Sequence, residues 1–185
     1  MRKQIQLTAL LLPILLLANS FISNSQSLSS DDVKAQLVKE WQRAKDYTIE
    51  YLNTMPANKY SFKAQDSIRS FAEQMLHLAA ANCFLMSQAT GQSMPAYAMS
   101  DFQHRASAAS KDSVMYFVTN SYDFAANAVK TSDATKWGEQ RKIFGFETTQ
   151  FGLILKAFEH QTHHRGQTTI YIRLQGIKPP QEKLF

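Results

Sequence analysis

The sequence predicts an all-α fold, a four-helix bundle preceded by an N-terminal signal peptide. Three observations predict it: the chain holds only 6 Gly and 5 Pro in 185 residues, its apolar residues recur at helical spacing in long segments, and no segment keeps the alternation of a strand. Hydrophobic residues make up 44% and charged residues 19% of the chain, which suits one folded core. We therefore expect a signal peptide at residues 1–27 and a single domain at residues 28–185.

The first 27 residues have the order of a secretory signal peptide. Arg2 and Lys3 precede a leucine-rich run at residues 7–18, and a polar stretch with small residues follows at 19–27. The leucine-rich run is shorter than the ~20 residues that span a bilayer. We expect cleavage within the polar stretch, export to the periplasm or the medium, and no stable membrane association of the mature chain. An uncleaved N-terminal anchor is the alternative.

Charge and cysteine content exclude several functions. Lys and Arg exceed Asp and Glu by 20 to 15, and two of the basic residues lie in the signal peptide, so the remaining excess is weak evidence for a polyanionic partner. The single cysteine, Cys83, excludes an intramolecular disulfide and a zinc site with two cysteine ligands. The sequence has no Gly-rich phosphate loop and no basic patch with interleaved aromatics, so we expect no nucleotide or nucleic-acid partner.

The first two helices are expected between clear start and stop signals. Side chains at residues 29–31 can cap the first helix, and Pro56 ends it. The second helix is expected to start near residues 66–67 and to stop at Gly91. The apolar residues with helical spacing are Val33, Leu37, Trp41, Ala44 and Leu52 in the first segment, and Phe71, Met75, Leu78 and Leu85 in the second.

The last two helices are separated from the others by loops. Residues 92–110 are rich in small polar residues and are expected to form a long connection, and residues 131–145 are expected to be a loop. The last helix should begin around residues 147–148 and continue to about Leu174, before Gly176. The stripe of the third helix consists of Val114, Phe117, Val118, Ser121, Ala125 and Ala128.

A pair of histidines on the last helix suggests a metal site. His160 and His164 are four residues apart, so on a helix they project from one face about 40° apart and can bind one ion. Neutral imidazole is a ligand for zinc, nickel, copper or iron. Two solvated histidines are the alternative, but the same stripe holds Leu153 and Tyr171, and unpaired polar rings in a core are unfavourable.

A third ligand is expected from His77 in the middle of the second helix. The small residues 79–81 follow it and leave room for a ligand or a pocket. For His77 alone, a hydrogen-bonded core histidine is the alternative. Three protein ligands leave a coordination position open, as in catalytic zinc sites. With no ligand charge to cancel that of the ion, we expect activity or affinity to rise between pH ~6 and ~8, partly because the histidines must lose their protons.

Other polar residues near these positions are candidates for assisting roles. Glu73 lies four residues before His77, so its carboxylate is the candidate general base; a solvated charge that suits the helix dipole is the alternative. Gln74 is also placed to approach the site. Gln167 and Tyr171 are expected to hydrogen-bond a ligand imidazole or to line the pocket.

The remaining candidates are expected outside the set of metal ligands. His163 should lie near the site without binding the ion, His104 should be a remote surface residue, and Glu159 should point outward. Arg165 is expected either to meet an anionic substrate or to pair with a neighbouring acid. Cys83 is expected to be a small buried hydrophobic residue.

Taken together, three segments resemble the DinB/YfiT superfamily of metal-dependent enzymes: Met75-Leu76-His77-Leu78, the segment from His160 to Gln167, and the segment from Tyr171 to Pro180. The resemblance covers the layout of the whole chain after the signal peptide. It implies a four-helix bundle, metal ligands at His77, His160 and His164, zinc or nickel as the ion, and a homodimer. Relatives with known activity include thiol transferases that use bacillithiol and a mycothiol-dependent isomerase.

Export would be a departure from the family pattern, because those thiols are cytoplasmic. The resemblance therefore supports the site more strongly than the reaction. The leading expectation is a metal-dependent hydrolase or thiol transferase with a small-molecule substrate. The alternatives are an exported metal- or ligand-binding bundle without turnover, and a helical bundle whose histidines only pack.

Overall fold

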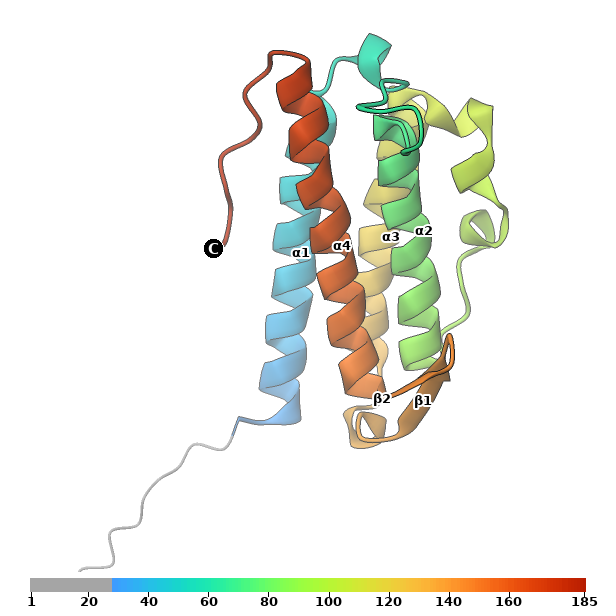
Figure 1. The fold of residues 1–185 in the computed structure, drawn as a ribbon. Coiled ribbons are helices and arrows are strands. Elements are labelled where there is room, and N and C mark those ends of the chain that lie inside the picture. The colour runs from blue at the N-terminus through green and yellow to red at the C-terminus, as the bar shows by residue number, and fades with distance from the viewer. Residues whose placement is uncertain (1–27) are drawn as a thin grey trace, which may run out of the picture.

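The computed structural model describes residues 28–185, and they form the predicted four-helix bundle (Figure 1). The predicted signal peptide lies outside the described residues. The long helices are α1 (Ser30–Thr54), α2 (Phe71–Thr90), α3 (Lys111–Thr131) and α4 (Gln150–Leu174). Helices α1 and α4 run in one direction and α2 and α3 in the other (Figure 1), so the chain between α2 and α3 must return along the bundle. That long connection, predicted at residues 92–110, contains three short 3₁₀ helices: Ala96–Met99, Phe102–His104 and Ala106–Ala109.

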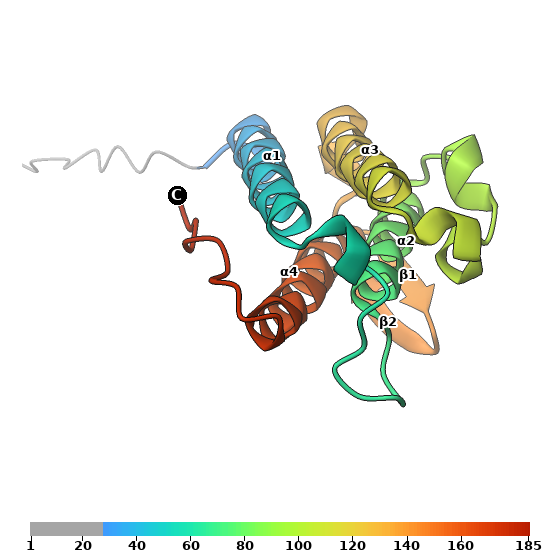
Figure 2. The ribbon, with the colours of Figure 1, turned by 90° about the horizontal axis from the view of Figure 1, so that it is seen from above.

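Helix α2 packs between α3 and α4, and α1 packs mainly on α3 (Figure 2). Along residues 28–185, no helix combines the length and the apolar composition that a bilayer span needs.

The helix starts follow capping side chains. Ser29 caps α1 as predicted, because its Oγ accepts the N–H of Asp32 at 3.1 Å and its own N–H donates to the Asp32 carboxylate. Helix α2 starts at Phe71, later than the predicted residues 66–67. The physical reason is a second capping box, in which Ser70 accepts the N–H of Glu73 and the Glu73 carboxylate accepts the N–H of Ser70.

A β-hairpin replaces the end of the predicted loop at residues 131–145. Strands β1 (Gln140–Ile143) and β2 (Phe146–Thr149) pair antiparallel, and β2 takes the residues at which α4 was predicted to begin. Helix α4 instead starts at Gln150, capped by Thr149. Phe144 and Gly145 form the tip with φ of 51° and 84°, the backbone of a two-residue hairpin turn.

The hydrophobic core runs along the bundle axis. Trp41 lies at its centre, with the rings of Tyr122 and Phe158 edge-on to it at 5.8 and 5.3 Å. The other large side chains that are fully buried are Leu52, Met55, Tyr60, Phe71, Met75, Leu76, Leu78, Met86, Phe102 and Leu153.

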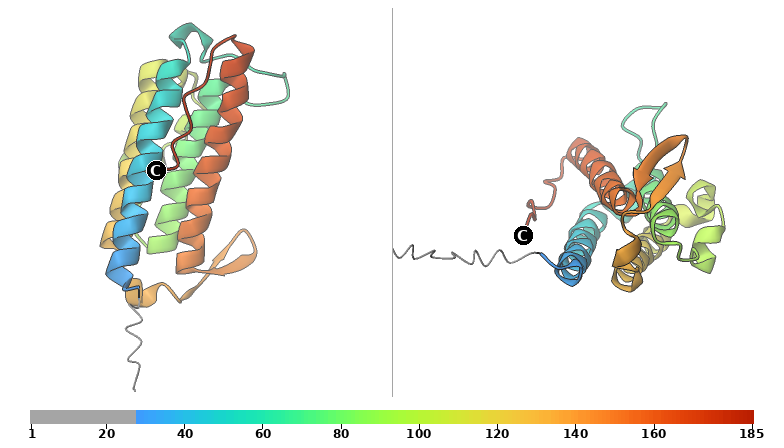
Figure 3. Two further views of the ribbon diagram at one scale, coloured as in Figure 1. Left: turned by 90° about the vertical axis from the view of Figure 1, so that its left-hand side faces the viewer. Right: turned by 90° about the horizontal axis from the view of Figure 1, so that it is seen from below.

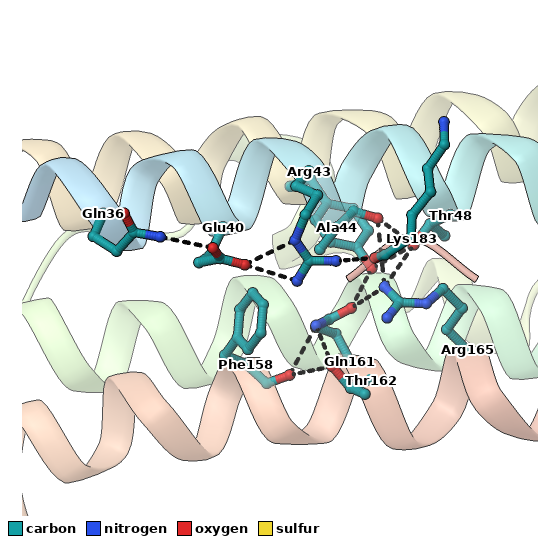
Figure 4. Close-up of polar contacts among 11 residues, drawn as sticks. Gln36, Glu40, Arg43, Ala44, Thr48, Phe158, Gln161, Thr162, Arg165 and Lys183 are labelled. Atoms are coloured by element: carbon teal, nitrogen blue, oxygen red, sulfur yellow. Dashed lines mark hydrogen bonds and ion pairs between the residues drawn. The ribbon is translucent and has the colours of Figure 1, made fainter. Parts of the chain in front are cut away.

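Hydrogen bonds between polar side chains connect α4 to α1 around Arg165 (Figure 4). The Arg165 guanidinium is buried, donates to Gln161 Oε1 at 2.9 Å, and lies 4.7 Å from the centre of the Tyr47 ring. Within residues 28–185 it pairs with no carboxylate. Both predictions for Arg165 were therefore wrong: burial removes it from any substrate, and it packs against α1 without an acidic partner.

The C-terminal segment after α4 returns along α1 (Figure 3). The Arg43 guanidinium donates to the Lys183 carbonyl, and the Lys183 ammonium pairs with Glu50. This segment covers the α1 side of the bundle. It does not cover the α2–α4 side, where the histidines of the predicted metal site lie.

Candidate metal centre

His77 of α2 and His160 and His164 of α4 converge between the two helices. One ring nitrogen of each histidine lies within 4.8 Å of the other two. The ring centres are 5.4 Å apart for His77 and His160, 4.6 Å for His77 and His164, and 4.3 Å for His160 and His164. The convergence predicted from the four-residue spacing and from His77 is confirmed.

The two histidines of α4 face each other through the same nitrogen type. Their Nε2 atoms are 3.1 Å apart, and the Nδ1 atom of His160 is buried with no hydrogen-bond partner in the described chain. Two neutral rings at this distance can share only one proton, whereas a divalent ion would accept a lone pair from each. Three imidazoles with no charged ligand are a donor set that suits zinc or nickel, so these residues fit such an ion.

A glutamine from the long connection fixes the orientation of His77. The Nδ1 atom of His77 lies 3.2 Å from Gln103 Oε1. Because an amide oxygen only accepts, the His77 Nδ1 must donate. The Nε2 lone pair of His77 is thereby free. Outer hydrogen bonds of this kind set the tautomer and the ring orientation of metal-binding histidines.

A chain of side chains connects His164 to the surface. Gln74 Nε2 donates to His164 Nδ1 at 2.7 Å and also contacts Gln167 Oε1, and Gln167 Nε2 donates to His163 Nε2 at 2.7 Å. In this orientation the His164 proton is on Nε2. Turning both glutamine amides by 180° reverses every bond in the chain, moves that proton to Nδ1, and frees Nε2 for an ion. The expectation that Gln74 and Gln167 lie close to the site is confirmed.

Burial keeps the three histidines neutral. It lowers the pKa of His160 to about 4 and that of His164 to about 3, with smaller contributions from the neighbouring histidines. Burial also lowers the pKa of His77. The expectation that loss of histidine protons contributes to a rise in activity between pH ~6 and ~8 is therefore wrong for His160 and His164, because both are already neutral below that range.

Glu73 lies near this centre but is bonded to the start of α2. Its carboxylate accepts the Ser70 N–H at 2.6 Å, lies 3.9 Å from the Lys63 ammonium, and contributes no atom to the histidine cluster. The Ser70 hydrogen bond is the main cause that lowers the pKa of Glu73. It is therefore a carboxylate at neutral pH, and its role as a general base stays a prediction.

Two hollows lie near this centre: one has His77 and His160 in its wall, and the other is bounded by Gln74 and Gln103, which contact His164 and His77. A polar one of about 790 Å³ is lined by Lys63, Arg69, Glu73, Gln74 and Gln167, among others. An apolar one of about 500 Å³ has His77 and His160 in its wall, next to Ala80 and Ala81, which confirms the space predicted beside the alanines. Gln103 lines both hollows.

The other sequence candidates lie outside the cluster. His163 is exposed; it hydrogen-bonds to Gln167 and packs edge-on against the His164 ring at 5.0 Å, but its nitrogens are not part of the cluster. His104 is exposed as predicted, but it is not remote: it lines the polar hollow and pairs with Asp101 at 2.7 Å. Tyr171 also lines that hollow, and its hydroxyl donates to the Arg69 carbonyl. Cys83 is buried as predicted, and burial raises its pKa to about 11, so the thiol is unreactive.

Sequence reasoning missed Gln103 and the aromatic residues Phe84 and Phe144 of the apolar hollow. Gln103 lies on a short 3₁₀ helix 26 residues from His77, and no spacing rule connects the two. Phe144 is at the tip of a hairpin that was predicted as a loop.

Comparisons with known proteins agree with this architecture. The crystal structure of a DinB-like protein from Bacillus cereus ATCC 10987 superposes with a TM-score of 0.69 at 15% identity, covering 80% of this chain and 97% of that one. The DinB-like protein YjoA of Bacillus subtilis gives a TM-score of 0.60 at 19% identity, covering 81% and 96%. At these identities the likeness shows the shared fold.

Sequence comparison identifies the family. The YrdA protein of Bacillus subtilis (strain 168) is 32% identical over 69 residues, which are 35% of this chain and 41% of YrdA, so the match spans less than half of that relative. A model of the DinB family matches residues 25–184. The chain therefore belongs to the DinB family.

Proposed function

We propose that this chain is a metal-dependent enzyme that binds zinc or nickel through His77, His160 and His164 and acts on a small molecule by hydrolysis or thiol transfer. The observation that carries the proposal is the convergence of three neutral imidazoles beside a hollow that His77 and His160 line, with no fourth His, Cys, Asp or Glu in the cluster among residues 28–185. Three protein ligands and adjacent space are the features of a catalytic rather than a structural site.

The bound ion would supply Lewis acidity and lower the pKa of a coordinated water or thiol. The residues of the chain would do the rest. Gln103 would hold the ring of His77 for binding, and Gln74 that of His164 once its amide is turned to accept from Nδ1. Lys63 and Arg69 line the polar hollow together with Asp66 and Glu73, so its wall carries charges of both signs and suits a polar part of a substrate. Glu73 in the same hollow is the candidate proton acceptor.

The alternative is a metal- or ligand-binding bundle without turnover. It is favoured by one observation: the carboxylate of Glu73, the candidate base, already caps α2. Metal analysis and turnover separate the two functions. Protein purified without added metal should contain close to one zinc or nickel per chain by plasma mass spectrometry and should hydrolyse a simple ester. Metal without turnover supports the binding module, and metal-free wild-type protein that binds no added zinc would refute both.

Export and self-association are further parts of the proposal. The order of charged, apolar and small residues at 1–27 supports export to the periplasm or the medium. Export would separate the protein from cytoplasmic thiols and would favour hydrolysis. N-terminal sequencing of protein from the cell envelope tests the cleavage, and light scattering of the mature chain tests the homodimer that the family resemblance implies.

A further inference from the structure

The apolar hollow at His77 and His160 is built from four separate parts of the chain, of which α4 contributes His160. Its wall takes Phe84 and Leu85 from α2, Met99 from the long connection, and Phe144 from the hairpin tip. Its volume of about 500 Å³ lies in the range of small-molecule sites. It is therefore continuous with the histidine centre and large enough for a ring or a short alkyl chain.

The lining of this hollow provides few charges that could bind a charged part of a ligand. Asp101 is the one residue with a formal charge in its lining, and its carboxylate is already 2.7 Å from the His104 ring. The other hollow is lined by four residues with a formal charge, namely Lys63, Asp66, Arg69 and Glu73. The two sides of the histidine centre thus differ in polarity, and the occupant of this side should carry an uncharged apolar group.

Phe144 is an unexpected residue for its position. Its φ of 51° is uncommon for a residue with a side chain, and Asn or Gly is the usual choice in such a hairpin turn. The residue is 76% exposed, yet its ring centre lies 5.7 Å from that of Phe84, its neighbour in the wall of the hollow. A bulky residue held at positive φ is a reason to look for a function, and here the backbone places an aromatic ring at the mouth of the hollow.

We infer that this hollow binds the hydrophobic part of the substrate, an aromatic ring or a short alkyl chain, while the reacting head of the same molecule lies at the histidines. Phe144 is then a specificity-determining residue that closes the apolar side. The inference rests on the proposed function, because it needs a head group that binds at the metal centre.

Hydroxamates test this, since the head group binds zinc while the tail varies. Zinc-loaded protein is titrated calorimetrically with acetohydroxamate, hexanohydroxamate and benzohydroxamate. The longer two should bind tighter than acetohydroxamate by on the order of tenfold, from the added apolar burial. Phe144→Asn should remove most of that gain and leave acetohydroxamate unchanged. Its melting temperature should not fall, because Asn tolerates positive φ.

Phe146→Asn is the matched control. Phe146 is also 76% exposed on the same hairpin but does not line the hollow, so this variant should keep the full gain. A second variant, Ala81→Phe, fills the hollow from α2 and should also abolish the gain. The inference is overturned, while the proposed function stands, if acetohydroxamate binds but the longer hydroxamates bind no tighter. The same conclusion follows if Phe146→Asn loses the gain as Phe144→Asn does. If acetohydroxamate does not bind to protein incubated with zinc, the proposed function fails and the inference fails with it.

Discussion

The Nε2 atoms of His160 and His164 lie 3.1 Å apart across one turn of α4. The ring of His77 on α2 approaches the same point, 4.6 Å from the ring of His164. Because burial lowers the pKa of His160 and His164 far below neutrality, the cluster presents lone pairs rather than charges at physiological pH.

Replacing either histidine of the pair should remove the metal. His160→Ala and His164→Ala are each expected to weaken zinc binding by more than about a hundredfold, beyond the loss typical of an outer hydrogen bond. His163→Ala is the control, because His163 is exposed and touches His164 only edge-on, with ring centres 5.0 Å apart, outside the cluster of three nitrogens. Calorimetric titration with zinc checks all three. Equal affinity of His163→Ala and His164→Ala would contradict the site.

The glutamines that hold the rings should affect affinity without binding the ion. Gln103→Leu and Gln74→Leu remove the partners of His77 Nδ1 and His164 Nδ1. Each should weaken zinc binding by about tenfold to a hundredfold. Gln36→Leu, an exposed change on α1, is the control. Nitrogen chemical shifts should report a change of tautomer at His77 in Gln103→Leu, and an unchanged tautomer with unchanged affinity would contradict the role.

The sequence predicts this centre better than its surroundings, for a physical reason. His160 and His164 are connected by helix geometry alone, and Ser29 by a local capping rule, so both follow from short-range spacing. The start of α2 was missed because Asp66 and Ser67 are also good capping residues, and only Ser70 has a glutamate three residues later. The contact of Gln103 with His77 depends on how a long connection folds back, which no local rule contains.

The hairpin was missed because its strands are short and weakly patterned. β1 and β2 have four residues each and none of these residues is buried, so neither strand needs the apolar alternation of a half-buried strand. The turn signal was also weak, because Phe144 stands where Asn or Asp is usual before glycine. The apolar hollow depends on this hairpin and could not be predicted without it.

The stability of the metal-free protein should fall as the pH drops below about 6.5. His160 and His164 have pKa values of about 4 and about 3 in the folded chain against 6.5 in the unfolded chain, so the unfolded state binds more protons between those values. Stability from this source is fully present above pH ~6.5 and is lost progressively as the pH falls from there to the folded pKa values of about 4 and about 3. Urea unfolding with a chelator, from pH 7 to pH 4, measures the loss.

The matched variant for this measurement is the double change His160→Gln and His164→Gln. It should lose less stability between pH 6.5 and pH 4.5, since the histidines no longer titrate there. Glu73 and Asp133, whose pKa values are lowered from 4.5 and 3.8, contribute at lower pH and in both proteins. Parallel curves for the two proteins over that window would contradict burial as the cause of the neutral histidines.

Two substitutions of Glu73 distinguish a structural role of its carboxylate from a catalytic one, because they should affect stability and turnover differently. Glutamine can serve in a capping box, so Glu73→Gln should change the free energy of unfolding by less than about 0.5 kcal/mol, whereas Glu73→Ala should lose about 1 kcal/mol with the cap. Neither should change zinc affinity, because the carboxylate is outside the cluster.

If Glu73 is the general base, Glu73→Gln should lower hydrolysis of 4-nitrophenyl acetate by the zinc-loaded protein by about a hundredfold. Glu159→Gln, an exposed change on α4, controls for the loss of a negative charge. Turnover in Glu73→Gln equal to that of the wild type would leave the carboxylate as the cap of α2 alone.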